Sequence, residues 1–348
     1  MSTLTIALAS LGGVVLAGVV AHGAWQARKA GPKRAAPAPE RDEPREPVMD
    51  LDGDTPTVAD DALVVPPDRR VNKRIVNRLD ALIDAIAPLR IEAPVSGGMV
   101  LAHLPTTRRA GGKPFLIEGL NTESGEWEPP AHSQHYGEFQ AGVQLANRTG
   151  PLNEIEYSEF VQKVQVFADG VGAMADFPDM LEAVASAREL DAFASQHDAQ
   201  LAVHLQARSA AWSVGYILQH AGRHGFVPGV VPGRLVLPAP DEGAPPVLTL
   251  TFDSQAALAD DPNLAALRDV TLSFDVPQTD AGAAPFVAWQ ASAQALSLGM
   301  DASIVDDHGR PLTPQGFGAI GAELGQLYIA LQERDLAAGS AAARRLFS

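Results

Sequence analysis

The sequence predicts an α+β fold with an N-terminal transmembrane helix, a disordered linker, and antiparallel sheets with helices packed on one face. Three observations support this prediction. The chain opens with a long uncharged stretch, continues with a Pro-rich charged segment, and then alternates between strand and helix patterns. The clearest strand covers residues 270–276, where Leu272, Phe274 and Val276 alternate with polar residues. Such alternation is typical of a strand with one buried face.

The amino-acid composition limits the kinds of function that the protein can have. The chain has 348 residues, of which 46% are hydrophobic and 20% charged, enough for a packed core. A net charge of −16 argues against nucleic acid as a partner, because nothing offsets repulsion from phosphates. The chain has no cysteine, which excludes disulfides, thiolate metal sites and cysteine nucleophiles and fits a reducing compartment.

The first residues predict a membrane anchor. Residues 4–25 carry no charge and, at about 1.5 Å per residue, span roughly 33 Å as a helix, enough to cross a bilayer. The basic residues Arg28, Lys29, Lys33 and Arg34 follow this stretch. By the positive-inside rule, residues 1–3 then lie outside and the bulk of the chain is cytoplasmic.

A cleaved signal peptide is the rival interpretation of this stretch. The segment Ala21-His22-Gly23 has small residues at plausible cleavage positions. A signal peptide, however, needs positive charge before its apolar segment, and no Lys or Arg precedes Arg28. We therefore favour an uncleaved span in contact with membrane lipid.

The span also has one face of small residues at every fourth position: Ala9, Gly13, Ala17 and Ala21. Such a face can pair transmembrane helices, so self-association through the span is one interpretation. Ordinary small-residue usage in an Ala-rich protein explains it equally well.

The rest of the chain divides into four parts by composition and pattern. Residues 26–77 are rich in Pro and mixed charge and lack hydrophobic periodicity, so we expect a flexible tether. Two folded units follow, over residues 78–197 and 198–338, and residues 339–348 are expected to be a flexible tail.

The two units look like diverged copies of one another. The matched segments are 84–94 with 198–208, Val143 and Leu145 with Leu248 and Leu250, Val164 and Val166 with Leu272 and Phe274, and 185–187 with 291–293. Their offsets stay close and in order, as a duplicated fold with altered loops would leave them.

In the second unit the patterns predict strands and helices in a definite order. Strands are expected at 201–207, 234–237, 247–252, 270–276 and 303–306, and helices at 214–220, 285–298 and 313–333. Thr313-Pro314 begins the last helix, with proline at its preferred first position. The segment 226–233 is expected to be an irregular edge strand.

No motif predicts catalysis. The pairs His132/His135 and His220/His224 lack an obvious third metal ligand. Residues 316–321 match G-x-G-x-x-G, but inside a predicted helix and not at a strand-to-helix turn, so close helix packing is the better interpretation. Asp306-Asp307 falls in a turn. We therefore expect no enzyme activity, no cofactor and no metal.

The order of these parts resembles the ZipA family of bacterial cell-division proteins. The resemblance depends on Gly299-Met300-Asp301, Ile304-Val305-Asp306-Asp307 and Leu312-Thr313-Pro314-Gln315, with Gly225-Phe226 and residues 270–277 in support. It covers residues 198–335. Residues 78–197 resemble the family domain only through their likeness to the second unit.

The resemblance implies a single-pass protein of the bacterial inner membrane at the division site. Its cytoplasmic domain would bind the C-terminal tail of FtsZ, a tubulin-like protein, and tether the FtsZ ring to the membrane during septum assembly. In the family, this tail lies in a shallow apolar groove on the exposed face of the sheet.

The positions that match the groove face are mostly polar here: Val231, Thr249, Thr251, Thr271, Ser273 and Asp275. Burying apolar side chains on Thr and Ser yields less than burying them on Met and Phe. Either the tail binds more weakly, or the site lies on the first unit, where Gln165 and Phe167 are expected to face the corresponding way, or between the units. A membrane-tethered adaptor that binds another division protein is the alternative function.

Overall fold

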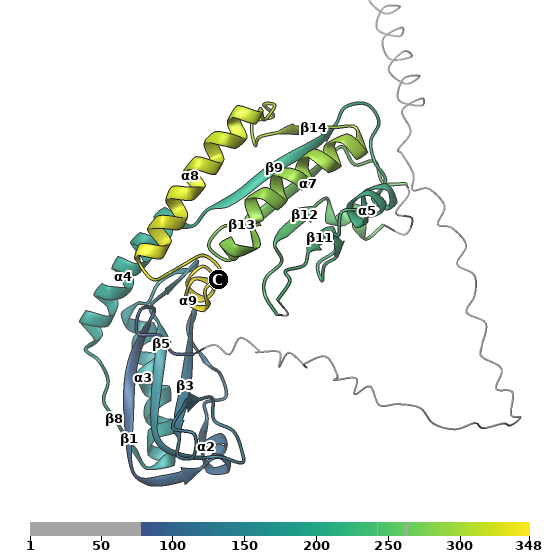
Figure 1. Ribbon diagram of the computed structural model, residues 1–348. Helices are drawn as coiled ribbons and strands as arrows, with labels where there is room; N and C mark the ends of the chain where they lie inside the picture. The colour runs from purple at the N-terminus through teal and green to yellow at the C-terminus, as the bar shows by residue number, and fades with distance from the viewer. Residues whose placement is uncertain (1–77, 242, 260, 262–263) are drawn as a thin grey trace, which may run out of the picture.

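The computed structural model describes residues 78–241, 243–259, 261 and 264–348. The predicted span, its small-residue face at Ala9, Gly13, Ala17 and Ala21, and the predicted tether lie outside these residues. Among the residues described, no helix is both long and apolar enough to cross a bilayer. The described part is α+β, with antiparallel sheets and helices in two units that lie end to end (Figure 1).

The first unit is built on a sheet in the order β2-β3-β5-β1-β8, with β4 paired to β3. Its strands are β1 (Asp84–Ser96), β2 (Arg109–Ala110), β3 (Lys113–Asn121), β4 (Trp127–Glu128), β5 (His135–Gln144) and β8 (Ala173–Ala175), and β6 (Ala146–Asn147) pairs separately with β7 (Gly150–Pro151). Its helices are α2 (Gly97–His103), α3 (Glu154–Val171) and α4 (Met180–His197).

The second unit has a sheet in the order β10-β11-β12-β13-β9-β14. The strands are β9 (Gln200–Ala207), β10 (Val227–Pro228), β11 (Arg234–Leu237), β12 (Leu248–Thr251), β13 (Asp269–Asp275) and β14 (Ala302–Val305). The helices are α5 (Val214–Gly222), α6 (Ser254–Ala257), α7 (Pro285–Met300) and α8 (Pro314–Glu333), with a short 3₁₀ turn, η1 (Ala281–Ala283). The strands and helices predicted for this unit are confirmed within a few residues.

The two units share one topology. The neighbours β3-β5-β1-β8 of the first sheet correspond in order to β12-β13-β9-β14 of the second. In both, a helix follows the central strand, a second helix precedes the short edge strand, and a third helix follows it: α2, α3 and α4 in one, α5, α7 and α8 in the other. This shared order supports an internal repeat.

Most of the residue pairs predicted for the repeat are nevertheless wrong. The match of 84–94 with 198–208 joins β1 to β9 and is correct. Val143 and Leu145 belong to β5 and the residue after it, which correspond to β13 and not to β12. Likewise, residues 185–187 lie on α4, whose counterpart is α8 and not α7.

The clearest error concerns the segment around Phe167. The expected strand face of Gln165 and Phe167 does not exist, because both residues lie on α3 and Phe167 is fully buried. The buried residues of this helix repeat with helical spacing: Tyr157, Phe160, Val164, Phe167, Ala168 and Val171. Asn153 and Glu156 form a capping box that starts the helix, and Gly172 ends it with φ of 72°.

The C-terminal residues are not a flexible tail, contrary to the prediction for 339–348. Ser340 caps a short helix, α9 (Ala341–Leu346), through a hydrogen bond from the Ala343 amide. The helix returns to the first unit, where Ala343, Leu346 and Phe347 are buried in that unit's core. The C-terminus accordingly lies at the junction of the units (Figure 1).

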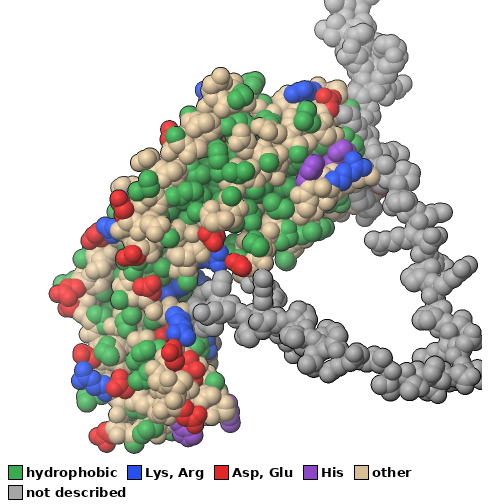
Figure 2. All heavy atoms as spheres, in the orientation of Figure 1, with side chains coloured by type: hydrophobic (Ala, Val, Ile, Leu, Met, Phe, Trp, Pro, Cys, Tyr) green, Lys and Arg blue, Asp and Glu red, His purple; other side chains and the backbone are tan. Residues whose placement is uncertain are grey.

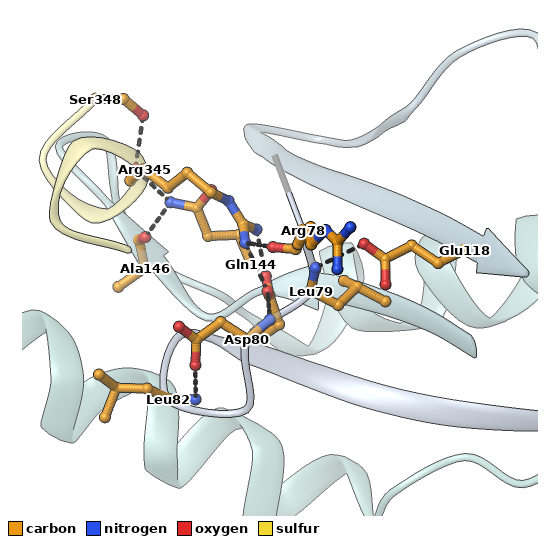
Figure 3. Close-up of polar contacts among 10 residues, drawn as sticks. Arg78, Leu79, Asp80, Leu82, Glu118, Gln144, Ala146, Arg345 and Ser348 are labelled. Carbon is orange, nitrogen blue, oxygen red and sulfur yellow. Dashed lines mark hydrogen bonds and ion pairs between the residues drawn. The ribbon is translucent and has the colours of Figure 1, made fainter. Parts of the chain in front are cut away.

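Arg345 secures this return by a buried ion pair. Its guanidinium donates to both carboxylate oxygens of Asp84, at 2.5 and 2.7 Å, and to the Arg78 carbonyl at 2.8 Å. The Gln144 amide donates to the carbonyls of Ala146 and Arg345 (Figure 3). The core of the first unit therefore includes residues from the end of the chain, and each unit has its own buried core among residues 78–348.

Candidate functional site

A shallow groove of about 490 Å³ crosses the open face of the second sheet. Five of the six residues predicted for the site line it: Val231, Thr249, Thr251, Thr271 and Ser273. The strand register brings them together, because Thr249 pairs with Ser273 and Thr251 with Thr271 on neighbouring antiparallel strands. The groove also includes Gln200, Ala202, Pro232, Gly233, Arg234 and Phe252.

The opposite face of the same strands supports the groove. Leu248, Leu250 and Leu272 point away from it and are fully buried beneath the helices, as their alternation predicts. Trp289 on α7 donates its indole N–H to the Leu272 carbonyl at 3.0 Å and packs edge-on against Phe274. The helix layer thus fixes the position of β13, which carries the centre of the groove.

The chemistry of the lining is mainly that of hydrogen bonding. Hydroxyl groups from β12 and β13 form its floor, while Val231, Pro232 and Phe252 add apolar surface at one side. Arg234 supplies the charge of the lining, and its guanidinium donates to the Thr249 hydroxyl at 3.4 Å. Such a surface fits an extended peptide that carries polar and acidic groups beside one or two apolar side chains.

Asp275 does not belong to the groove, in contrast to its predicted place there. Its carboxylate pairs with Arg148 of the first unit at 2.7 Å, and Arg148 also binds Asp198 in a bidentate contact. Burial raises the pKa of Asp275 above 3.8, although Arg148 acts in the opposite direction. Asp275 therefore connects the two units and is not available to a ligand.

Part of the corresponding face of the first unit is covered by the chain itself (Figure 3). The Leu79 amide donates to the Glu118 carboxylate at 3.0 Å, and Gln140 donates to its other oxygen at 2.8 Å. A Cβ on Gly142 would lie 2.4 Å from the Leu79 side chain. Leu79 thus lies over β3 and β5, and Glu118 is buried beneath it.

Sequence reasoning missed one polar cluster beside the groove. His204 on β9 lies between two carboxylates, with Nδ1 3.2 Å from Asp269 and Nε2 3.2 Å from Asp307. The Thr271 hydroxyl also lies 3.2 Å from Nδ1. Because Nδ1 faces a carboxylate as well, it is placed to donate and not to take a proton from Thr271, so the cluster does not form an activated nucleophile.

The turn after β14 holds a carboxylate with a shifted pKa. The Asp306 side chain accepts hydrogen bonds from the backbone amide of Arg310 at 2.9 Å, its guanidinium at 2.8 Å, and the amide of His308 at 2.9 Å. These bonds, the Arg310 amide first among them, lower the pKa of Asp306 from 3.8 to about 2. This residue is a structural acid of the turn, in agreement with the prediction.

We expect the Asp306 carboxyl to titrate near pH 2 in carbon-detected NMR of residues 78–348. Because its folded pKa lies below the unfolded value, its contribution to stability is present above pH 4 and is lost as pH falls from about 4 to 2. In Arg310→Ala the midpoint is expected to move toward 3.8. An unchanged midpoint in that variant would show that the Arg310 guanidinium does not lower the pKa of the carboxyl.

The other motifs of the sequence are structural where the structure describes them. The segment 316–321 lies inside α8, and a Cβ on Gly321 would come within 3.0 Å of the Phe286 ring, so the glycine permits close helix packing. The segment 226–233 contains the short edge strand β10, as predicted. Over residues 78–348, apart from the four that are not described, no cluster of His, Asp and Glu could hold a metal ion.

No protein-family model matches the chain, and no curated protein matches it either.

Proposed function

We propose that this protein is a membrane-tethered adaptor of bacterial cell division that holds the C-terminal tail of FtsZ in the groove of its second unit. The observation that carries the proposal is the difference between the two sheets. The groove of the second sheet is open, whereas Leu79 covers part of the equivalent face of the first. The choice of FtsZ rests on the sequence resemblance to the ZipA family.

The proposed mechanism is tethering and needs no chemical step. A spanning helix at residues 4–25 would anchor the protein, and residues 26–77 would let the folded units reach filaments near the membrane. Each groove needs only modest affinity, because many tethers along one filament bind with avidity. The hydroxyl-rich lining is compatible with such a modest single contact.

The proposal is tested by titrating a peptide of the FtsZ C-terminal tail onto residues 78–348 by calorimetry. We expect saturable binding, and a loss of about tenfold or more in affinity for Thr251→Trp, which fills the groove. Tryptophan suits a strand position, so the fold should persist. The matched control is Glu138→Trp, at an exposed position on β5 of the first unit. Equal loss in both variants, or no binding by the parent protein, would contradict the proposal.

Arg234 is expected to contribute charge recognition to the same groove. Replacing it by Gln should lower the affinity for an acidic peptide severalfold and reduce the dependence of that affinity on salt. Arg208, on the loop after β9, serves as the control position, because it lies outside the groove lining. An affinity that is unchanged in Arg234→Gln across salt concentrations would show that the ligand places no acid there.

A second candidate function is an adaptor of the same fold for a different division protein. The polar lining favours it, since five of the groove side chains offer a hydroxyl or amide group: Gln200, Thr249, Thr251, Thr271 and Ser273. Exchange of this second unit for a homologous domain with an apolar groove separates the two. If FtsZ is the partner, the exchanged protein should bind the tail more tightly; if it is not, the exchange should create binding that the parent lacks.

A further inference from the structure

The outward helix face of the second unit differs in charge from that of the first. Helices α3 and α4 carry nine Asp, Glu, Lys or Arg residues in 36 positions. Helices α7 and α8, their counterparts, carry two in 36 positions, and α5 carries none. The two units share a topology, so the fold itself does not require this difference.

The side chains that α7 turns away from the sheet form one uncharged line. They are Val287, Ala291, Gln294 and Leu298, spaced at intervals of four, three and four residues. Val287 is 65% exposed and Leu298 is 86% exposed. The residues that anchor the helix, such as Trp289 and Leu296, lie on the opposite side.

Helix α8 presents a second line with the same spacing. This line consists of Gln315, Ala319, Ala322, Gln326, Ile329 and Glu333, with Glu333 at the end of the helix, and the exposed Glu323 lies on its flank. Ile329 is 52% exposed. Intervals of four and three residues are the spacing by which helices meet one another in long parallel or antiparallel contacts. Figure 2 shows hydrophobic side chains gathered over α7 and α8, with most charged side chains toward the margins.

We infer that this face, named here the α7–α8 face and defined by the ten residues of the two lines, binds the same face of a second copy of the chain. The distribution of charge over the chain indicates that the partner is a second copy. The ten basic and ten acidic residues before Arg78 cancel, so the net charge of −16 belongs to residues 78–348. Two copies therefore repel each other across most of their surfaces, and the α7–α8 face, whose helices carry two charged residues, Glu323 and Glu333, is where they can approach.

The size of the face agrees with a reversible dimer. Helices of 16 and 20 residues are about 24 and 30 Å long, and neighbouring helices lie about 10 Å apart. Two such faces would bury roughly 1,000 Å² in total, at the lower end for specific interfaces. A twofold-symmetric contact would bury the exposed lines of both α7 and α8, because each copy offers the same surface. The groove lies on the other side of the sheet and stays open, so the dimer is independent of the proposed function.

Sedimentation velocity of residues 78–348 over a range of concentrations tests the inference. We expect a reversible shift from monomer to dimer in the micromolar to sub-millimolar range, and its loss in Ala291→Glu, which places two like charges at the centre of the pair. Val166→Glu on α3 is the matched control, since Val166 is 71% exposed on the equivalent helix of the first unit. That variant should dimerise as the parent does.

Cross-linking supplies a second test, which does not depend on a variant that disrupts the dimer. Because the chain has no cysteine, Ala291→Cys and Val166→Cys each introduce a single reactive site. A short bismaleimide should link Ala291→Cys into covalent dimers about fivefold more than Val166→Cys, as a twofold contact requires. A monomer at all concentrations, or equal cross-linking at both positions, would overturn the inference.

Discussion

Replacing Arg345 by Met is expected to destabilise the first unit by about 3–5 kcal/mol, because the change leaves the buried Asp84 carboxylate without its partner. The loss should appear as a lower urea midpoint for residues 78–348. Arg344→Met is the matched control, since Arg344 lies next in the chain and its guanidinium donates a hydrogen bond of 3.3 Å to the Gln278 carbonyl. A midpoint shift no larger than that of the control would contradict the role of the pair.

Two further measurements separate charge from packing in this prediction. Burial raises the pKa of Asp84 above 3.8, and loss of Arg345 removes the two largest influences that lower it, while the hydrogen bond from the Asp80 backbone remains. The unpaired carboxylate of Arg345→Met therefore destabilises the protein at neutral pH, and the deficit should shrink as pH falls through the raised folded pKa toward 3.8. The double variant Asp84→Leu with Arg345→Met should recover much of the loss, because no buried charge remains.

Replacing Trp289 by Ala is expected to cost about 3–5 kcal/mol, concentrated in the second unit. The indole is fully buried, packs against Phe274 and Phe317, and donates to the Leu272 carbonyl. Its loss leaves a cavity beneath β13 and removes the indole donor from the Leu272 carbonyl of the same strand. Amide hydrogen exchange should show β13 and its neighbours opening while the first unit keeps its protection.

The matched control for this variant is Val287→Ala on the same helix. Val287 is exposed, so we expect a change within about 0.5 kcal/mol. Trp289→Ala is also expected to abolish peptide binding, because the groove floor depends on the position of β13. Stability of Trp289→Ala within 1 kcal/mol of the parent would contradict the account of how the helix layer supports the groove.

The second unit could be predicted from sequence because its signals are local. Alternation over residues 270–276 and the Thr313-Pro314 helix start each fix an element without reference to distant residues. The same alternation placed Thr249, Thr251, Thr271 and Ser273 on one open face, where they line the groove. The α+β class follows from the same signals.

The first unit is harder to predict from sequence, because its short segments fit a helix or a strand equally well when they are taken one at a time. The run from Lys163 to Asp169 alternates as a strand would, yet helical spacing over α3 and the capping box of Asn153 and Glu156 make it a helix. That capping box is visible in the sequence and could have identified the helix. The strand-like alternation covers too few residues to distinguish a strand from a helix by itself.

Contacts between distant residues could not be predicted. Arg148 binds Asp275 across 127 positions, and Arg345 binds Asp84 across 261. No local pattern encodes such pairs, so a charged tail and a polar strand end looked solvent-exposed. One practical consequence is that cutting the chain at residue 197 would remove α9 from the first unit's core, and tests of function need residues 78–348 together.

Peptide binding in the groove of the second unit can be followed residue by residue. An amide-detected NMR titration of residues 78–348 with the FtsZ tail peptide tests it most directly. We expect the largest shifts on Thr249, Thr251, Thr271 and Ser273 and on the rim at Val231, while the covered part around Leu79 and Glu118 stays unperturbed. Saturating shifts confined to the first unit, or no shifts at all, would contradict it.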